Sequence, residues 1–233
     1  MFSPRFTITN KILASVVEIE KVAQVLEIVT LEPEWEMKLK QECLVRRATA
    51  AVSFGETQLS GDDVGKIVKD EPGRDDRPSQ VALRVGVVAK EKDIQKTMNW
   101  LNAHRLVTQT AYLASKFKQD NFSEKDLESL NSILGERTVS VTNLGVYREK
   151  GPGEFEGVDF PPAIEVPYQM EDLFLWFKGV GKTDLNPVIK AGVMLLELIR
   201  IRPFADDNLM TGLFFFGLVL ACEGLGMKEM WAY

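Results

Sequence analysis

The stretch IRIRPFADDNLMTG, residues 199–212, joins two strongly apolar segments of the chain and decides how the fold is read. Apolar residues recur at helical spacing over 187–201 and again over 208–223, which predicts two core helices. The turn between them is polar, and Asp206, Asp207 and Asn208 are residue types favoured at a helix N-cap and first turn. Three roles are open for this turn: a helix cap alone, a retained site for an anion or a Mg-nucleotide, or altered catalysis.

The composition of the 233-residue chain is that of a soluble globular protein, with 45% apolar and 27% charged residues. The net charge of −6 argues against a surface for nucleic acid. Cys43 and Cys222 lie far apart, so a disulfide framework or a metal cluster is not expected, and a cytoplasmic location is. The most apolar run, 212–221, is too short to span a bilayer, and no membrane contact is expected.

Most of the remaining chain has helical periodicity. Ser60 and Ser123 are expected to cap helices, because each precedes an acidic first turn. The charged loop 69–80 contains Pro and Gly and is the best internal boundary, between an N-terminal helical region 1–80 and a core 81–233. Helices are predicted over 9–30, 34–51, 80–103, 105–117, 123–134 and 168–178.

The segment 136–168 differs from the rest of the chain. It alternates β-branched and polar residues and carries Gly-Pro-Gly at 151–153 and Pro-Pro at 161–162, which predicts a short hairpin or an extended flap. The predicted fold class is therefore all-α with one small β-hairpin. The single histidine, His104, argues against a histidine-based metal site and is expected to be a structural or solvated residue on a helix surface.

Several short motifs follow one another in a defined order. Gly145-x-Tyr147-Arg148 precedes Phe160-Pro161-Pro162, then a Val166-Pro167 helix with Met170, Leu173 and Trp176, and finally Arg202-Pro203-Phe204-Ala205-Asp206-Asp207-Asn208. In order and spacing these motifs resemble the Fic (filamentation induced by cAMP)/Fido family, whose signature is H-P-F-x-D-G-N-G-R. The segment 48–64 resembles the family's inhibitory-helix region. Longer Fic proteins carry further helices, so a truncation after residue 233 is expected.

The resemblance implies a transfer of AMP from ATP to a protein hydroxyl, and it assigns a role to each signature position. The family histidine acts as general base, and that position is Arg202. The family acid holds Mg²⁺, and that position is Asp206. The remaining positions bind phosphate, and they are occupied by Asp207, Asn208, Leu209 and Met210, so that RPFADDNLM stands in place of the signature. The family's inhibitory glutamate falls on Gly55, with Glu56 one residue late.

The expected function is that of a degenerate Fic-fold protein without ordinary AMP transfer, which keeps a protein-binding or nucleotide-binding role with Mg·ATP as the implied cofactor. The alternative is a divergent Fic-type nucleotidyltransferase with another base, for which His104 and Asp207 are the candidates. A third reading is a product with no selected activity. A protein partner is expected at the flap 149–166 by strand addition, and a homodimer is left open.

Overall fold

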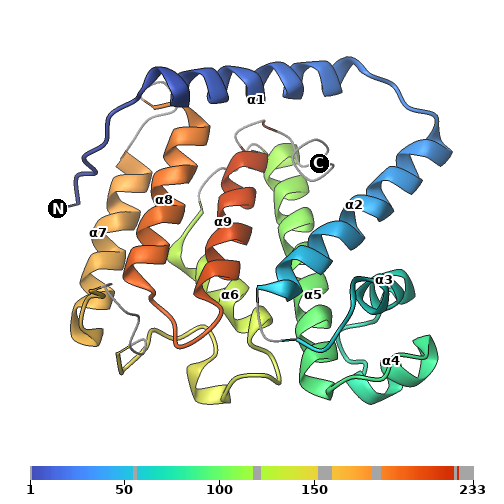
Figure 1. The fold of residues 1–233 in the computed structure, drawn as a ribbon. Coiled ribbons are helices and arrows are strands. Elements are labelled where there is room, and N and C mark those ends of the chain that lie inside the picture. Colours follow the sequence, from blue (N-terminus) through green and yellow to red (C-terminus); the bar gives the residue numbers. More distant parts are fainter. Residues whose placement is uncertain are drawn as a thin grey trace.

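The chain folds as an all-α protein in the computed structural model, which describes residues 2–54, 57–117, 122–151, 159–179, 185–222 and 225. Figure 1 shows the arrangement of the helices. The α-helices of the described residues are α1 (Asn10–Ile28), α2 (Pro33–Ser53), α3 (Gly61–Asp70), α4 (Pro78–Val85), α5 (Glu91–Phe117), α6 (Glu124–Leu134), α7 (Val166–Gly179), α8 (Pro187–Ile201) and α9 (Asn208–Cys222). Two 3₁₀ turns, Val141–Asn143 and Ala163–Glu165, lie between α6 and α7.

Helix α9 lies at the centre of the molecule and packs against α5, α6 and α8 (Figure 1). Its apolar residues face more than one neighbour, as expected for a helix that is hydrophobic all round. The ring of Phe215 lies 5.8 Å from the ring of Phe174, 6.2 Å from that of Phe177 and 6.4 Å from that of Phe122. The prediction that 212–221 is a buried core helix is confirmed.

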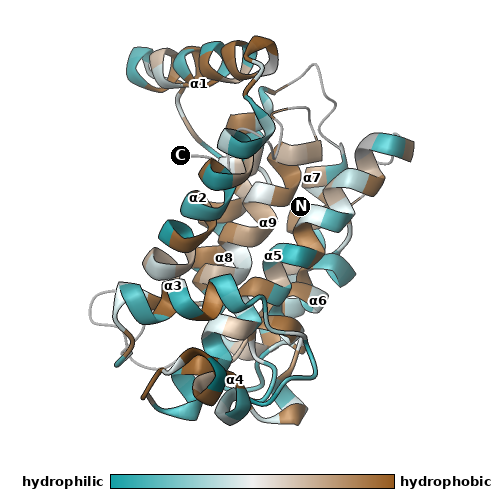
Figure 2. Cartoon of the chain, turned by 90° about the vertical axis from the view of Figure 1, so that its right-hand side faces the viewer, coloured by the Kyte–Doolittle hydropathy of each residue, from teal (hydrophilic) through white to brown (hydrophobic). Residues whose placement is uncertain are grey.

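The N-terminal helices cover one side of this core. Helices α2 and α3 pack against each other and against α5. Ser60 caps α3, as predicted, and it does so through a capping box with Asp63. Helix α1 lies along the end of the molecule where α8, α9 and α5 have one of their ends (Figure 1), and Asn186 Nδ2 donates a hydrogen bond to Glu20 Oε1 of α1 (2.7 Å). Hydrophilic and hydrophobic residues alternate along α1 in Figure 2. Within the described ranges, no helix is both long enough and apolar enough to cross a membrane.

The helices predicted over 80–103 and 105–117 are wrong in their boundaries. Helix α4 ends at Gly86, which has a left-handed backbone (φ 68°) that glycine adopts without strain. Helix α5 then runs without a break through His104, because no glycine or proline interrupts that stretch. His104 is half-buried there rather than solvated, and its ring stacks on Trp100 at 5.7 Å.

The described residues of 136–168 contain no strand. They carry the two 3₁₀ turns, an isolated antiparallel bridge between Tyr147 and Phe204, and the start of α7. The middle of the predicted flap, 152–158, lies outside the described residues, so the hairpin stays a prediction.

Candidate functional site

The loop between α8 and α9 makes a sharp turn at each of its ends. Arg202 ends α8 in the left-handed conformation (φ 47°), and its N–H donates to Leu198 O (2.9 Å). Asp207 precedes α9 and is also left-handed (φ 56°). A residue with a Cβ pays roughly 1–2 kcal/mol for this conformation, although aspartate tolerates it better than most. The two positions together bring the loop back over the N-terminus of α9.

Asn208 fixes the shape of this loop. Its side chain is buried, its Oδ1 accepts a hydrogen bond from Phe204 N–H (2.8 Å), and its Nδ2 donates to Phe204 O (2.8 Å). Asp206 Oδ1 accepts from Asp207 N–H (2.8 Å). Phe204 is itself fully buried, and its ring lies 5.6 Å from that of Tyr147. The loop is therefore held by internal hydrogen bonds and by one aromatic anchor.

Asn131 of α6 is a second support that the sequence reasoning missed. Its Nδ2 donates to Asp206 O (3.0 Å) and Thr211 Oγ1 (3.2 Å), and its Oδ1 accepts from Gly145 N–H (3.2 Å). Gly145 is left-handed (φ 64°), and a Cβ there would lie 2.6 Å from Glu128 O, so only glycine fits. A lone asparagine on an amphipathic helix gives no motif, and only the fold shows what it joins.

Arg148 holds the segment before the flap against the end of α8. It is buried, and its guanidinium donates to four carbonyl oxygens, those of Ile201 (3.2 Å), Arg202 (2.7 Å), Lys150 (3.0 Å) and Pro161 (2.6 Å). Burial and the neighbouring Arg202 lower the pKa of Arg148, but a guanidinium stays charged at neutral pH. These contacts give Arg148 a structural role at this junction.

A cavity of about 260 Å³ opens beside the loop. The residues to which the resemblance assigns a role in catalysis, metal binding or phosphate binding all line it: Arg202, Asp206, Asp207, Asn208, Leu209 and Met210. Its other walls come from the end of α2 and the residue after it, from Thr57, from α5 and from α6: Ala51, Val52, Phe54, Thr57, Asp93, Lys96, Trp100 and Leu134. The loop is thus the wall of a cavity as well as a helix cap.

The predicted inhibitory segment borders the same cavity. Phe54 and Thr57 both line it, whereas Gly55 and Glu56 between them lie outside the described residues. Lys96 and Asp93 come from α5, and neither was predicted, because they lie more than a hundred positions before the loop. Asp93 is buried, and one of its oxygens accepts from Gln58 N–H (3.0 Å).

Asp207 carries a carboxyl group whose pKa is raised by its surroundings. Burial, and then the charge of Asp206, raise the pKa of Asp207 to about 6, against the opposing effect of Lys96 and Lys92. Asp207 Oδ2 is buried and has no hydrogen-bond partner within the described part of the chain. This carboxyl group therefore titrates close to neutral pH.

Arg202 and His104 are less suited than Asp207 to act as a base at the loop cavity. The guanidinium of Arg202 lies 5.3 Å from the centre of the Phe160 ring, and it cannot accept a proton at ordinary pH. His104 is not among the residues that line the cavity. Burial, and then Arg47 and Arg105, lower the pKa of His104 to about 4. Of the two predicted alternative bases, the structure brings only Asp207 to the loop cavity.

Asp207→Asn is expected to stabilise the protein at pH 7 and to flatten its stability between pH 4 and pH 7. The folded-state pKa of Asp207 is raised, so the folded state binds more protons than the unfolded state in this window, and stability falls as pH rises through about 6. A shift from 3.8 to about 6 corresponds to at most about 3 kcal/mol. Urea unfolding at several pH values measures the difference between the two proteins, which should close towards pH 4.

Asp207→Gly is the companion variant, because it removes the charge and also the left-handed strain. The free energy of unfolding of Asp207→Gly should exceed that of Asp207→Asn by about 1 kcal/mol at pH 7. Parallel pH profiles for wild type and Asp207→Asn would contradict the burial of this charge.

The structure is an all-α domain in which the loop 202–207 leads directly into the core helix α9. Residues 121–220 match the model of the Fic/DOC family. The matched residues cover α6 to α8, the loop 202–207 and α9 as far as residue 220, so the resemblance found in the sequence is confirmed.

Solved structures of Fic proteins have the same fold. A Fic family protein from Desulfovibrio desulfuricans is 20% identical, with a TM-score of 0.68 over 98% of this chain and 64% of that one. A Fic domain-containing signaling protein from Bacteroides thetaiotaomicron is 18% identical, with a TM-score of 0.65 over 89% of this chain and 72% of that one. Fic-1 from C. elegans is 16% identical, with a TM-score of 0.69 over 91% of this chain and 58% of that one.

The chain spans less than two thirds of the first and third of these proteins. At such identities the likeness concerns the fold alone. A comparison with curated proteins gave no match.

Proposed function

We propose that this Fic-fold protein does not carry out the ordinary AMP transfer implied by its family resemblance, and that it binds a nucleotide with Mg²⁺ at the loop cavity. The observation that carries the proposal is the cavity itself: every residue from Asp206 to Met210, and Arg202, lines it. A turn that served only as a helix cap would not need an adjoining space with both cations and carboxylates on its walls.

The loss of transfer is argued from the two substituted positions. Arg202 replaces the family's general base, and the loss of such a base costs roughly 10²–10⁴ in rate. Met210 replaces the family's arginine, and the loss of one donor to the transition state costs roughly 10²–10³. Either change alone would leave ordinary AMP transfer very slow.

The charges of the cavity favour a phosphate that arrives with a cation over a bare one. The described residues that line the cavity include three carboxylates and two cations: Asp93, Asp206 and Asp207, and Lys96 and Arg202. Mg²⁺ is commonly held by one or two carboxylates and by the phosphate oxygens of its ligand. Asp206 fits this role, because its side chain is exposed and, among the residues that the structure describes, only its Oδ1 accepts a hydrogen bond, from Asp207 N–H. Lys96, Arg202 and the first turn of α9 would face the phosphates.

Calorimetric titration with Mg·ATP at pH 7 tests the proposal. We expect binding to the wild type, weakened at least about tenfold in Asp206→Ala because the metal loses its carboxylate. Arg202→His, run in parallel, should still bind, since Lys96 and the helix terminus remain. The absence of heat at millimolar Mg·ATP in the wild type and in Arg202→His would overturn the proposal and leave the loop as a helix cap.

A second candidate function, a divergent nucleotidyltransferase, is favoured by one observation. Asp207 lines the cavity and has a pKa of about 6, within the range that suits a general base. ATP labelled at the α-phosphate, added to the same titration samples, separates the two functions. Label on protein in the wild type that disappears in Asp207→Asn, with binding kept, would favour the enzyme over the binding protein.

The predicted protein partner at 149–166 is kept as part of the proposal. Both described ends of this segment are tied to the loop, since Lys150 O and Pro161 O accept hydrogen bonds from the guanidinium of Arg148. Phe160 lies under the guanidinium of Arg202. A partner bound to this segment would therefore lie next to the loop cavity.

A further inference from the structure

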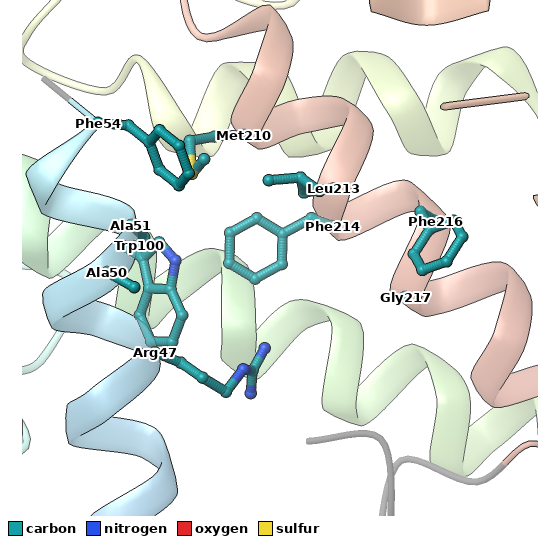
Figure 3. A pocket seen from close by; sticks show the side chains of 10 residues that line it. All are labelled: Arg47, Ala50, Ala51, Phe54, Trp100, Met210, Leu213, Phe214, Phe216 and Gly217. Carbon is teal, nitrogen blue, oxygen red and sulfur yellow. The ribbon is translucent and has the colours of Figure 1, made fainter. Parts of the chain in front are cut away.

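A second cavity, of about 270 Å³, lies between α2, α5 and α9 (Figure 3). We call it the aromatic cavity. Its lining residues are Arg47, Ala50, Ala51, Phe54, Trp100, Met210, Leu213, Phe214, Phe216 and Gly217. It shares Ala51, Phe54, Trp100 and Met210 with the loop cavity, so the two spaces adjoin. The proposed nucleotide site makes no use of its remaining walls.

Aromatic rings form the walls of this cavity. The rings of Trp100 and Phe214 lie 5.6 Å apart at an angle of 50°, and both side chains are buried. Phe54, near the end of α2, is 69% exposed although it borders an apolar space. Figure 3 shows these three rings around the same space, with Met210 beside Phe54. A flat ring placed there would gain edge or face contacts with them.

One cation completes the cavity. Among its lining residues in the described part of the chain, Arg47 is the one that carries a charge. Its guanidinium carbon lies 5.5 Å from the centre of the Trp100 ring. Burial lowers the pKa of Arg47 to about 10, so the group stays charged at pH 7 but is partly desolvated. A guanidinium has five N–H donors, and charge-assisted hydrogen bonds from it to an anion strengthen as water is excluded.

The volume limits what can enter. A cavity of roughly 150 Å³ is enough for benzene, and pockets for drug-sized ligands begin at roughly 300 Å³. A volume of about 270 Å³ therefore suits one or two fused rings with a small substituent. Ring walls, one cation and this volume together define one class of ligand.

We propose that the aromatic cavity binds a small aromatic anion, a one- or two-ring carboxylate or its phosphate counterpart, with its ring packed against Trp100, Phe54 and Phe214 and its anionic group on Arg47. This proposal does not rest on the nucleotide proposal, since Arg47 and Phe214 line only the aromatic cavity, although Phe54 and Trp100 border both cavities. A ligand in it would also contact Met210, where the family has its arginine.

Calorimetric titration with 2-naphthoate, and with the neutral 2-naphthalenemethanol as matched probe, tests the proposal on the full chain. Wild type should bind both probes, with naphthoate the tighter. Arg47→Met should weaken naphthoate at least about tenfold and leave the neutral probe within about twofold, because only the charged contact is lost. Ala50→Leu, at an exposed position of α2 on the cavity wall, should weaken both probes by filling the space.

Leu83→Ser, at an exposed position of α4 away from the cavity, should bind both probes as the wild type does. The absence of naphthoate binding at millimolar concentration overturns the proposal. Equal naphthoate affinity in wild type and Arg47→Met overturns the role of the cation. If Arg47→Met fails to fold, Ala50→Glu replaces it, because the added carboxylate should repel naphthoate far more than the neutral probe.

Discussion

Arg148→Met should lower the free energy of unfolding by about 3–5 kcal/mol. The buried guanidinium donates to four carbonyl oxygens, and methionine fills part of the volume but donates to none of them. Each buried carbonyl left without a partner costs about 1–3 kcal/mol, offset in part because a buried charge is also removed. Urea unfolding at pH 7 measures the change, and thermal unfolding should show a loss of roughly 10 °C.

Two controls make the result specific to the geometry of Arg148. Arg148→Lys keeps the charge but not the planar fork, so it should recover only a small part of the lost stability. Arg200→Met removes an exposed arginine that pairs with Glu197 three residues earlier, and its effect should stay below about 1 kcal/mol. If Arg148→Met and Arg200→Met have the same free energy of unfolding, the four carbonyl groups do not depend on Arg148 for their stabilisation.

Asn208→Ala is expected to cost about 2–4 kcal/mol. The asparagine side chain satisfies both the N–H and the C=O of Phe204, and Phe204 is fully buried. Alanine leaves both backbone groups without that partner, and each such loss costs about 1–3 kcal/mol when water is excluded. Chemical unfolding of the variant at pH 7 gives the value directly.

Asn208→Asp and Asn143→Ala bracket this prediction. Aspartate keeps an acceptor for Phe204 N–H but turns a carboxylate oxygen towards Phe204 O, so it should be at least as destabilising as alanine at pH 7 and less so in acid. Asn143 is exposed, and its replacement should change stability by less than about 0.5 kcal/mol. If Asn208→Ala is as stable as Asn143→Ala, the loop does not depend on the hydrogen bonds between the Asn208 side chain and the backbone of Phe204.

The helices could be predicted where the chain carries its own local signals. Ser60 and Ser123 sit at capping boxes as expected, and the apolar period of 187–201 and 208–223 gives α8 and α9 within one or two residues. The prediction failed near His104, where separate helices were expected over 80–103 and 105–117. Without glycine or proline, packing against α9 keeps α5 continuous there.

The candidate site was predictable only along one wall. Asp206 to Met210 are consecutive, so the motif itself brings them together. Lys96, Asp93 and Asn131 reach the loop from helices far away in sequence, and each looks like an ordinary polar residue of an amphipathic helix. Tertiary packing alone gives them their place, which no periodicity could reveal. The left-handed backbone of Asp207 was likewise hidden, although the family's glycine at that position is consistent with it.

The brace formed by Asn131 also has a bearing on the order of folding. Asn131 on α6 is hydrogen-bonded to Asp206 and Thr211, which lie 75 and 80 positions further along the chain. Closing such long loops is slow compared with forming helices, because chain entropy is lost before the stabilising contacts between the joined elements have formed. The loop cavity should therefore take shape late, after α6 and α9 have docked. A nascent or partly unfolded chain would hold its helices without yet offering a site to a ligand.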